Sequence, residues 1–247
     1  MRTRLDLEMT RRGLAISREG AQRLIMAGRV RLNSRLVAKP DIKVDEDSQI
    51  SVIANGSDYA SRGGYKLAAA FDRFPIVVEG RHALDVGAST GGFTDVLLQR
   101  GAARVIALDV GYGQLAETLR RDPRITVIDR RNIRHVAPGD LPYKPDLIVI
   151  DTSFISLKLV LPAVIAIAAT SADLVALVKP QFEVGKGKVG KGGIVREDSL
   201  RIQALTEVLD FAKSIGLESL ETIEAPITGA AGNREYLTHF RWVAGKI

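Results

Sequence analysis

The sequence predicts an α/β protein with a mostly parallel sheet of seven strands, preceded by a small α+β domain. Two observations lead to this prediction. After residue 61, strand-like apolar runs alternate with helical segments, which is typical of a parallel sheet covered by helices on both faces. Before residue 54, two short helical segments and several short strands follow one another instead. Residues 54–61 contain Asn-Gly and Ser-Asp and have no periodicity, so we expect a linker there.

The predicted first domain, residues 1–53, is a compact unit of two helices and a small sheet. Its first helix begins near Leu5. Ser17 is the expected N-cap of the second helix, because its hydroxyl can accept a hydrogen bond from an amide of the next turn. Gly28 supplies the left-handed end of that helix. Short strands are then expected at 30–32, 36–37 and 50–52.

The predicted second domain, residues 62–247, carries the alternating pattern. Its strand-like runs lie at 82–86, 104–109, 125–128, 147–151 and 174–178, and further strands are expected at 217–225 and 235–243 after a helix from 196 to about 214. The longest apolar run, Leu159–Ala169, contains Pro162 and is shorter than the roughly 20 residues that a membrane span needs. We expect it to form a buried helix, and we expect no membrane association.

Positive charge is concentrated at the start of the chain. The net charge is +6, and residues 1–40 hold ten Lys and Arg against three Asp and Glu, whereas the remaining residues hold 25 against 26. Such asymmetry favours a polyanionic partner and salt-dependent binding, although a solvated basic surface is the alternative. The residues that we expect to contact RNA in this domain are Arg4, Arg11, Arg12, Arg18, Arg23, Arg29 and Arg31.

Several protein classes are excluded or disfavoured by composition. The chain has no cysteine, which removes disulfides, thiolate metal sites and cysteine nucleophiles. Its three histidines are scattered without paired ligand spacing, so we expect no metal site. The N-terminal residues lack an apolar signal-peptide core. We expect a cytoplasmic protein, with a monomer slightly favoured.

The motif LDVGASTGGFTDVLL, residues 84–98, predicts a cofactor site. It ends a strand, turns on glycines and opens a helix, and in open α/β sheets ligands bind beyond the carboxyl ends of the strands. The glycine spacing differs from the dinucleotide fingerprint, and a carboxylate at the strand end suits the cationic methionine part of S-adenosylmethionine better than a pyrophosphate. A glycine turn without a ligand is the alternative. The predicted cofactor residues of this motif are Asp85, Gly87, Ser89, Thr90, Gly91, Gly92 and Phe93.

Two further carboxylates follow the next two strands. Asp109 is placed to accept hydrogen bonds from both hydroxyls of a ribose, and Asp129 from an adenine amino group. The later tract GKGKVGKG, residues 185–192, nearly matches a phosphate loop but has Gly192 where a magnesium-binding Ser or Thr should stand. We expect a loop whose lysines, Lys186, Lys188 and Lys191, contact phosphates, although a solvated loop is equally compatible.

Four charged residues stand in otherwise apolar or glycine-rich phrases: Lys66, Asp151, Lys179 and Glu235. They resemble the Lys-Asp-Lys-Glu tetrad of FtsJ-like RNA 2′-O-methyltransferases. The phrases SRGGYKL, DVGASTGGFTD, DTSFISL, KPQFE and GNREY resemble the TlyA, or hemolysin-A-like, family of ribosomal RNA 2′-O-methyltransferases, and residues 5–52 resemble the S4 RNA-binding domain that precedes the catalytic domain in that family.

The resemblance implies a Rossmann-like catalytic domain, S-adenosylmethionine as cofactor, and cytidine 2′-hydroxyls of ribosomal RNA or ribosomal subunits as substrate. A ribose hydroxyl is a weak acid, so its proton must be removed or its developing charge stabilised. Lys179 is the expected base or orienter, and Asp151 and Glu235 are expected to hold the lysines by charge-assisted hydrogen bonds. Lys66 is expected to help place the hydroxyl.

Other functions fit the residues less well. An amine methyltransferase should carry an Asn/Asp-Pro-Pro-aromatic turn where this chain has Asp151-Thr152-Ser153-Phe154, and cytosine-C5 transfer requires a cysteine. A membrane-lytic protein, suggested by the family's older name, needs an amphipathic or spanning segment. An RNA-binding assembly factor with a residual methyltransferase fold remains as the second alternative.

Overall fold

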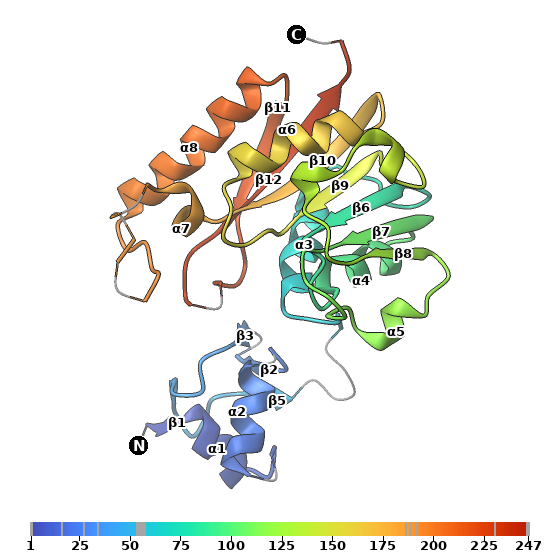
Figure 1. Cartoon of the computed structure of the whole chain (residues 1–247). Coiled ribbons are helices and arrows are strands. Elements are labelled where there is room, and N and C mark those ends of the chain that lie inside the picture. Colours follow the sequence, from blue (N-terminus) through green and yellow to red (C-terminus); the bar gives the residue numbers. More distant parts are fainter. Residues whose placement is uncertain are drawn as a thin grey trace. The chain divides into compact units, whose positions relative to one another are not determined.

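The computed structural model describes residues 2–15, 17–26, 28–33, 35–52, 58–185, 187, 189–190, 192–229 and 231–245, the side chain of Arg23 excepted. The chain divides into two compact units, residues 1–62 and 63–247 (Figure 1). Residues 54–57 of the predicted linker lie outside the described residues, and residues 58–61 belong to the first unit.

The N-terminal unit is built from two helices and short antiparallel strands. Its helices are α1 (Leu5–Arg11) and α2 (Arg18–Met26); β2 (Val30–Leu32) pairs with β3 (Arg35–Val37) and β5 (Ile50–Val52), and β1 (Thr3–Arg4) pairs with β4 (Lys43–Val44). The predicted cap and stop are confirmed: Ser17 Oγ accepts a hydrogen bond from Gly20 N at 3.1 Å, and Gly28 has a φ of +71°. The β1–β4 ladder was not predicted, because two-residue strands show no periodicity.

The core of this unit lies between the two helices and the sheet. Both helices direct apolar residues inward at helical spacing. Strands β2 and β4 each add one buried valine. The fully or almost fully buried residues are Leu5, Met9, Ala21, Ile25, Val30 and Val44.

The C-terminal unit contains the predicted seven-stranded sheet, in the order β11-β12-β10-β9-β6-β7-β8. Its strands are β6 (His82–Val86), β7 (Arg104–Leu108), β8 (Ile125–Ile128), β9 (Leu147–Ile150), β10 (Ser171–Val178), β11 (Glu218–Glu224) and β12 (Tyr236–Val243). All neighbours are parallel except β12, which runs antiparallel to both β10 and β11. The order reverses at β6, which lies between β7 and β9 and therefore marks the topological switch point.

Helices cover both faces of this sheet (Figure 1). They are α3 (Gly63–Arg73), α4 (Gly92–Gln99), α5 (Glu117–Arg120), α6 (Leu157–Ile167), α7 (Pro180–Glu183) and α8 (Asp198–Ser214), with 3-10 turns at Ile133–His135 and Pro138–Asp140. Successive strand residues point to opposite faces. Leu84 and Val86 of β6 pack in the cluster that contains α6 and α8, whereas Asp85 faces α4.

The predicted buried helix over Leu159–Ala169 is present as α6, but only one of its faces is buried. Val160, Leu161 and Val164 are fully buried, whereas Leu159 is 52 % exposed. Within the described parts of the chain, no helix combines the length and the apolar character that crossing a membrane requires.

Candidate active site

The predicted cofactor motif lies at the switch point of the sheet. Gly87 directly follows β6 with a φ of +87°, a conformation that side chains other than glycine rarely adopt. A Cβ atom at Gly87 would lie 2.6 Å from the carbonyl oxygen of Asp151, so the ends of β6 and β9 touch there. Gly91, with a φ of +98°, packs against Leu115 and Leu119 and starts α4. Gly87 therefore lets two strand ends approach each other, and Gly91 lets Leu115 and Leu119 pack against the turn.

A pocket of about 700 Å³ opens at this edge of the sheet. Four of the predicted residues line it: Gly87, Ser89, Asp109 and Asp151. Gln114, Asn132 and Ile133 also line it, and sequence reasoning missed them because they lie in irregular segments without a motif. The pocket is thus walled by the segments that follow β6, β7, β8 and β9.

Asp109 is held in place by backbone amides. Its Oδ2 accepts from Ser89 N at 2.8 Å and its Oδ1 from Gly111 N at 2.7 Å. Each carboxylate oxygen keeps a further lone pair, so both can still accept from a pair of ribose hydroxyls. This geometry agrees with the expectation from the sequence.

Asp85 is a buried carboxylate with a half-satisfied hydrogen-bonding capacity. Its Oδ2 accepts from Thr94 Oγ1 at 2.6 Å, whereas its Oδ1 is buried and has no hydrogen-bond partner among the described residues. Burial is the main cause that raises the pKa of Asp85 to about 7; the hydrogen bond from Thr94 opposes the rise and the neighbouring charge of Asp151 adds to it. An orphaned buried carboxylate oxygen fits a cationic ligand group, as the ammonium of S-adenosylmethionine would be.

Three other motif residues support the turn instead of lining the pocket. Phe93 is 3 % exposed and packs in the core at the start of α4, which begins at Gly92. The carbonyl of Thr90 accepts from Ala116 N at 3.2 Å. These residues hold the loop in shape and are not among those that form the pocket wall.

Asp129 lies just after β8 and is held by neighbouring groups. Its Oδ2 lies 2.9 Å from Arg120 Nη2 and accepts from Gly113 N at 3.1 Å. The residue lines a separate hollow of about 420 Å³ and not the large pocket. Arg131 lines both hollows, so the two adjoin, and an adenine contact by Asp129 stays a prediction.

The four tetrad residues form two buried ion pairs. Lys179 Nζ lies 2.6 Å from Asp151 Oδ1 and donates to Ser153 Oγ at 2.9 Å. Lys66 Nζ, on α3, donates to Glu235 Oε2 at 2.5 Å. Lys66, Lys179 and Glu235 are all less than a tenth exposed. Charged groups at such depth are retained at a cost in stability, which is typical of functional sites.

Sheet register brings the two pairs to one edge. Val178 of β10 is paired with Tyr236 of β12. Lys179, which follows β10, and Glu235, which precedes β12, therefore lie at the next pair of opposed positions. Asp151, directly after β9, belongs both to the lysine pair and to the pocket wall. Asp151 therefore connects the wall of the candidate cofactor pocket to the candidate catalytic lysine.

Comparison with known proteins identifies the family to which this chain belongs. Residues 59–242 match the FtsJ-like methyltransferase family, and residues 3–50 match the S4 domain. This chain belongs to the FtsJ-like methyltransferase family. It is 48% identical to the 16S/23S rRNA (cytidine-2′-O)-methyltransferase TlyA of Mycobacterium tuberculosis, over 98% of this chain and 90% of that one.

Two relatives of the FtsJ-like enzyme carry hemolysin names. Hemolysin A of Brachyspira hyodysenteriae is 41% identical over 96% of this chain and 99% of its own length. A solved structure described as a hemolysin from Streptococcus thermophilus has a TM-score of 0.76 and 41% identity, and covers 98% of this chain and 89% of that chain. The fold expected from the sequence, an S4 domain followed by a methyltransferase domain, is confirmed. The methyl donor of this methyltransferase is S-adenosylmethionine, as the sequence predicts.

The FtsJ-like domain also presents an aromatic residue that the sequence analysis overlooked. Phe154 lines the pocket and is 90 % exposed, and its φ of +63° is rare for a bulky residue. Its ring lies 5.2 Å from that of Phe182, centroid to centroid. An exposed aromatic residue held in a strained backbone conformation beside a pocket is a candidate contact for a planar ligand.

Most predicted RNA-binding arginines of the S4 unit are engaged with its own carboxylates. Arg4 and Arg18 both contact the buried Asp6, each at 3.0 to 3.1 Å. Arg11 and Arg12 contact the buried Glu8 in the same way. These contacts lower the pKa of Asp6, chiefly through Arg4, and hold the pKa of Glu8 at about 2, chiefly through Arg11. Arg4, Arg11 and Arg18 nonetheless keep part of their side chains exposed.

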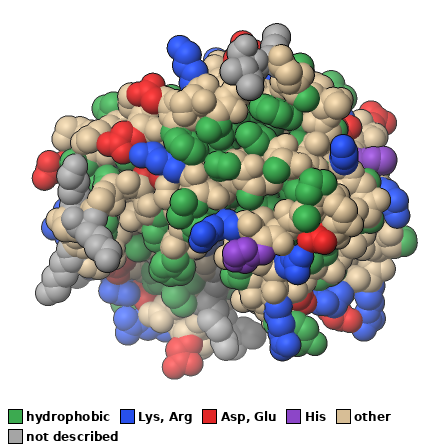
Figure 2. All heavy atoms as spheres, turned by 45° about the horizontal axis from the view of Figure 1, so that its top comes forward, with side chains coloured by type: hydrophobic (Ala, Val, Ile, Leu, Met, Phe, Trp, Pro, Cys, Tyr) green, Lys and Arg blue, Asp and Glu red, His purple; other side chains and the backbone are tan. Residues whose placement is uncertain are grey.

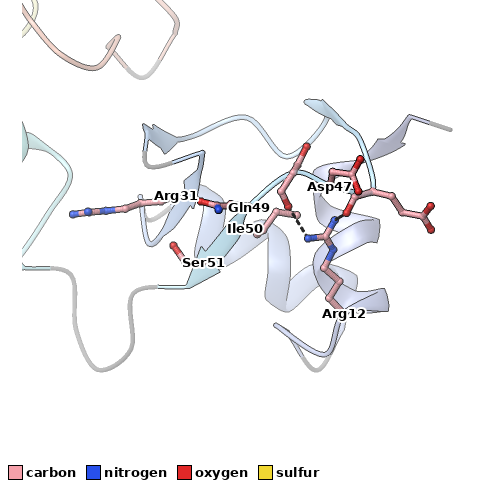
Figure 3. Close-up of a pocket in the computed structure, with 8 residues that line it drawn as sticks. Arg12, Arg31, Asp47, Gln49, Ile50 and Ser51 are labelled. Atoms are coloured by element: carbon pink, nitrogen blue, oxygen red, sulfur yellow. Dashed lines mark hydrogen bonds between the residues drawn. The ribbon is translucent and has the colours of Figure 1, made fainter.

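Arg12 has a mainly internal role. It donates to the carbonyls of Ser48 and Glu46, each at 2.7 Å, and so fastens the turn before β5 to α1. Figure 3 shows Arg12 reaching this turn and Arg31 extending away from it, at the wall of a hollow of about 470 Å³. Acidic and basic residues line this hollow together, so it does not resemble a phosphate site.

The remaining predicted contacts are distributed as follows. Arg31 is 44 % exposed and lies 3.8 Å from Asp58, and Arg29 Nε is buried. The side chain of Arg23 and the residues Lys186, Lys188 and Lys191 lie outside the described residues. On the molecular face drawn in Figure 2, basic and acidic side chains are interspersed.

Proposed function

We propose that this chain transfers the methyl group of S-adenosylmethionine to the 2′-hydroxyl of a cytidine in ribosomal RNA. The observation that carries the proposal is the place of Asp151, which lines the pocket at the switch point and lies 2.6 Å from the buried Nζ of Lys179. The pocket would hold the cofactor while the adjoining lysine acts on the substrate. The TlyA relative described above acts on cytidine 2′-hydroxyls of 16S and 23S rRNA, as its name states.

The cofactor would be held by residues of three strand ends. Asp109 offers both carboxylate oxygens to ribose hydroxyls, and the orphaned Oδ1 of Asp85 offers an acceptor to the ammonium group. Asn132 and Ile133 line the part of the pocket that Asp129 was expected to reach. When bound, S-adenosylmethionine supplies an electrophilic methyl carbon.

Lys179 is the group that we assign to the ribose hydroxyl. Nζ would orient the ribose hydroxyl or take up its proton, and the carboxylate of Asp151 would stabilise positive charge on Nζ. Ser153 Oγ fixes the direction of Nζ. Lys66, held by Glu235, supplies a second positive charge beside the reacting oxygen. Burial strengthens each of these interactions, because water does not screen them.

The S4 unit would bind the RNA. Arg4, Arg11 and Arg18 keep part of their side chains exposed while their carboxylate contacts orient them. Guanidinium groups in this state can bind phosphate oxygens without giving up the whole of their internal contacts.

The test is transfer of labelled methyl from S-adenosylmethionine to purified small and large ribosomal subunits. Wild type, Lys179→Ala and Lys158→Ala are compared, because Lys158 pairs with Glu207 on the outer helices and lies outside the proposed machinery. We expect alkali-resistant ribose label with wild type and Lys158→Ala and its loss with Lys179→Ala. Label on a base, or cofactor binding without transfer to either subunit, would contradict the proposal and favour the assembly-factor alternative.

A further inference from the structure

The one-turn helix α7 adjoins a member of each ion pair, Lys179 along the chain and Glu235 through a side-chain contact. It begins directly after Lys179 and comprises Pro180–Glu183. Proline at its first position pre-sets the helical φ, and the missing amide costs nothing there. This turn therefore starts at a defined place relative to Lys179, which ends the neighbouring strand.

Gln181 connects α7 to the Lys66 pair. Its Nε2 donates to Glu235 Oε1 at 3.1 Å, while Glu235 Oε2 accepts from Lys66 at 2.5 Å. Gln181 Oε1 is buried and accepts no hydrogen bond from the residues that the structure describes. Leaving a buried acceptor unpaired costs stability, so fold stability does not account for a glutamine at this position.

Glu183 connects the same turn to the loop that carries Asp151 and Ser153. Its Oε2 accepts from Ser156 Oγ at 2.6 Å, and its Oε1 accepts from Leu157 N at 2.9 Å. Between them, the rings of Phe154 and Phe182 pack together at 5.2 Å. The loop after β9 is thus fastened to α7 at its far end, while Lys179 contacts its near end.

We propose that Gln181 and Glu183 are positioning residues that set the distance between the two lysine–carboxylate pairs. Gln181 holds Glu235, and with it Lys66; Glu183 holds the 151–157 loop, and with it the partners of Lys179. Because the two side chains are only two residues apart on the same short helix, they point in different directions from one fixed backbone, and the two pairs are not free to move apart. The inference rests on the proposed function for its catalytic consequence, but not for its geometry.

The first test measures the geometry alone. Full-length wild type, Gln181→Met and Glu183→Met are treated with formaldehyde and a borane reductant, and methylation of each lysine is followed by mass spectrometry. Paired, buried amines react slowly, so we expect Gln181→Met to accelerate labelling of Lys66 several-fold with little change at Lys179, and Glu183→Met to do the reverse. Equal effects at both lysines, or no effect at either, would overturn the assignment.

The second test measures the consequence for transfer. We expect the single-turnover rate per cofactor-loaded protein to fall roughly 10- to 100-fold in both Met variants, as small displacements of reacting groups do. Glu183→Gln, which keeps an acceptor for Leu157 N and a group that can bond Ser156, should restore most of the rate. Glu117→Gln, which removes the exposed partner of Arg121 on α5, should leave it unchanged.

The outcomes separate the two proposals. A rate loss that only follows lost cofactor binding, or a Glu183→Gln variant as slow as Glu183→Met, would count against positioning. If wild type transfers no methyl to ribose, the proposed function fails, and the labelling pattern still decides the role of α7.

Discussion

At the scale of single residues, the site depends on charged groups that the fold buries. Asp85, Lys66, Lys179 and Glu235 would all be ordinary surface charges if they were exposed. In the fold each is less than a tenth exposed, and only Asp85 has a carboxylate oxygen without a partner among the described residues. The cofactor pocket and the tetrad are therefore sensitive to single substitutions that leave the fold intact.

Cofactor affinity should depend on pH through Asp85. Its pKa is raised to about 7 from an ordinary 3.8, so the folded protein holds this proton where the unfolded chain does not. The stability that this protonation contributes is present below about pH 4 and is lost as the pH rises through 7. An ammonium group requires the ionised form, so affinity for S-adenosylhomocysteine should rise about tenfold from pH 6 to pH 8.

Calorimetric titration of S-adenosylhomocysteine at pH 6, 7 and 8 checks this expectation. Asp85→Asn serves as the control, because an amide does not titrate in this range. The same rise of affinity in the variant would assign the pH dependence to another group.

Phe154 combines an unfavourable backbone conformation with an exposed aromatic ring. Its left-handed backbone costs about 1 to 3 kcal/mol for a bulky residue, so Phe154→Gly should leave stability unchanged or raise it. The same change removes an exposed ring that can stack on a nucleobase, a contact of about 1 to 3 kcal/mol, so methyl transfer should slow. Urea unfolding followed by the fluorescence of Trp242, with single-turnover assays, measures both; a variant that is less stable and equally active would contradict this account.

At the scale of elements, long periodic segments were predictable and short ones were not. The strands around the glycine turn were placed correctly, because apolar runs bounded by Asp85 and Asp109 mark them clearly. The four residues of α7 have no periodicity, so Gln181 and Glu183 could not be assigned a role from sequence. Asp129 follows β8 as the sequence predicts, and its contact with adenine stays a prediction because the hollow that it lines only adjoins the pocket.

Helix α1 should be the acid-sensitive element of the S4 unit. The folded pKa of Glu8, about 2, lies below its ordinary 4.5, so its stabilising contribution is present above about pH 4.5 and is lost as the pH falls toward 2. Hydrogen exchange of amides in residues 5–26 should therefore accelerate between pH 5 and pH 3, after correction for the intrinsic rate. Glu8→Gln should exchange faster at neutral pH and respond less to acid; an unchanged acid response would place the titrating group elsewhere.

At the scale of the whole molecule, the arginines proposed to bind RNA and the candidate cofactor pocket belong to separate units of the chain. Arg18 lies in the first unit, is 53 % exposed and is oriented by Asp6, whereas the pocket lies entirely in the second. Arg18→Ala should weaken binding to ribosomal RNA and reduce the salt slope by about one, because one phosphate contact is lost. Filter binding at several salt concentrations measures the slope, and cofactor affinity should stay constant; a parallel loss of both would show coupling between the units.

The place of β12 in the sheet has a consequence for the order in which this protein becomes active during synthesis. β12 is made after β11 but lies between β11 and β10, so β11 has no place in the sheet until β12 has emerged from the ribosome. The ion pair of Lys66 cannot form until Glu235, 169 residues later, has been made. The walls of the pocket, by contrast, are complete once the segment after β9 has been made. A growing chain would accordingly gain a cofactor site well before it gains a complete tetrad, and would transfer no methyl group until Glu235 has been added.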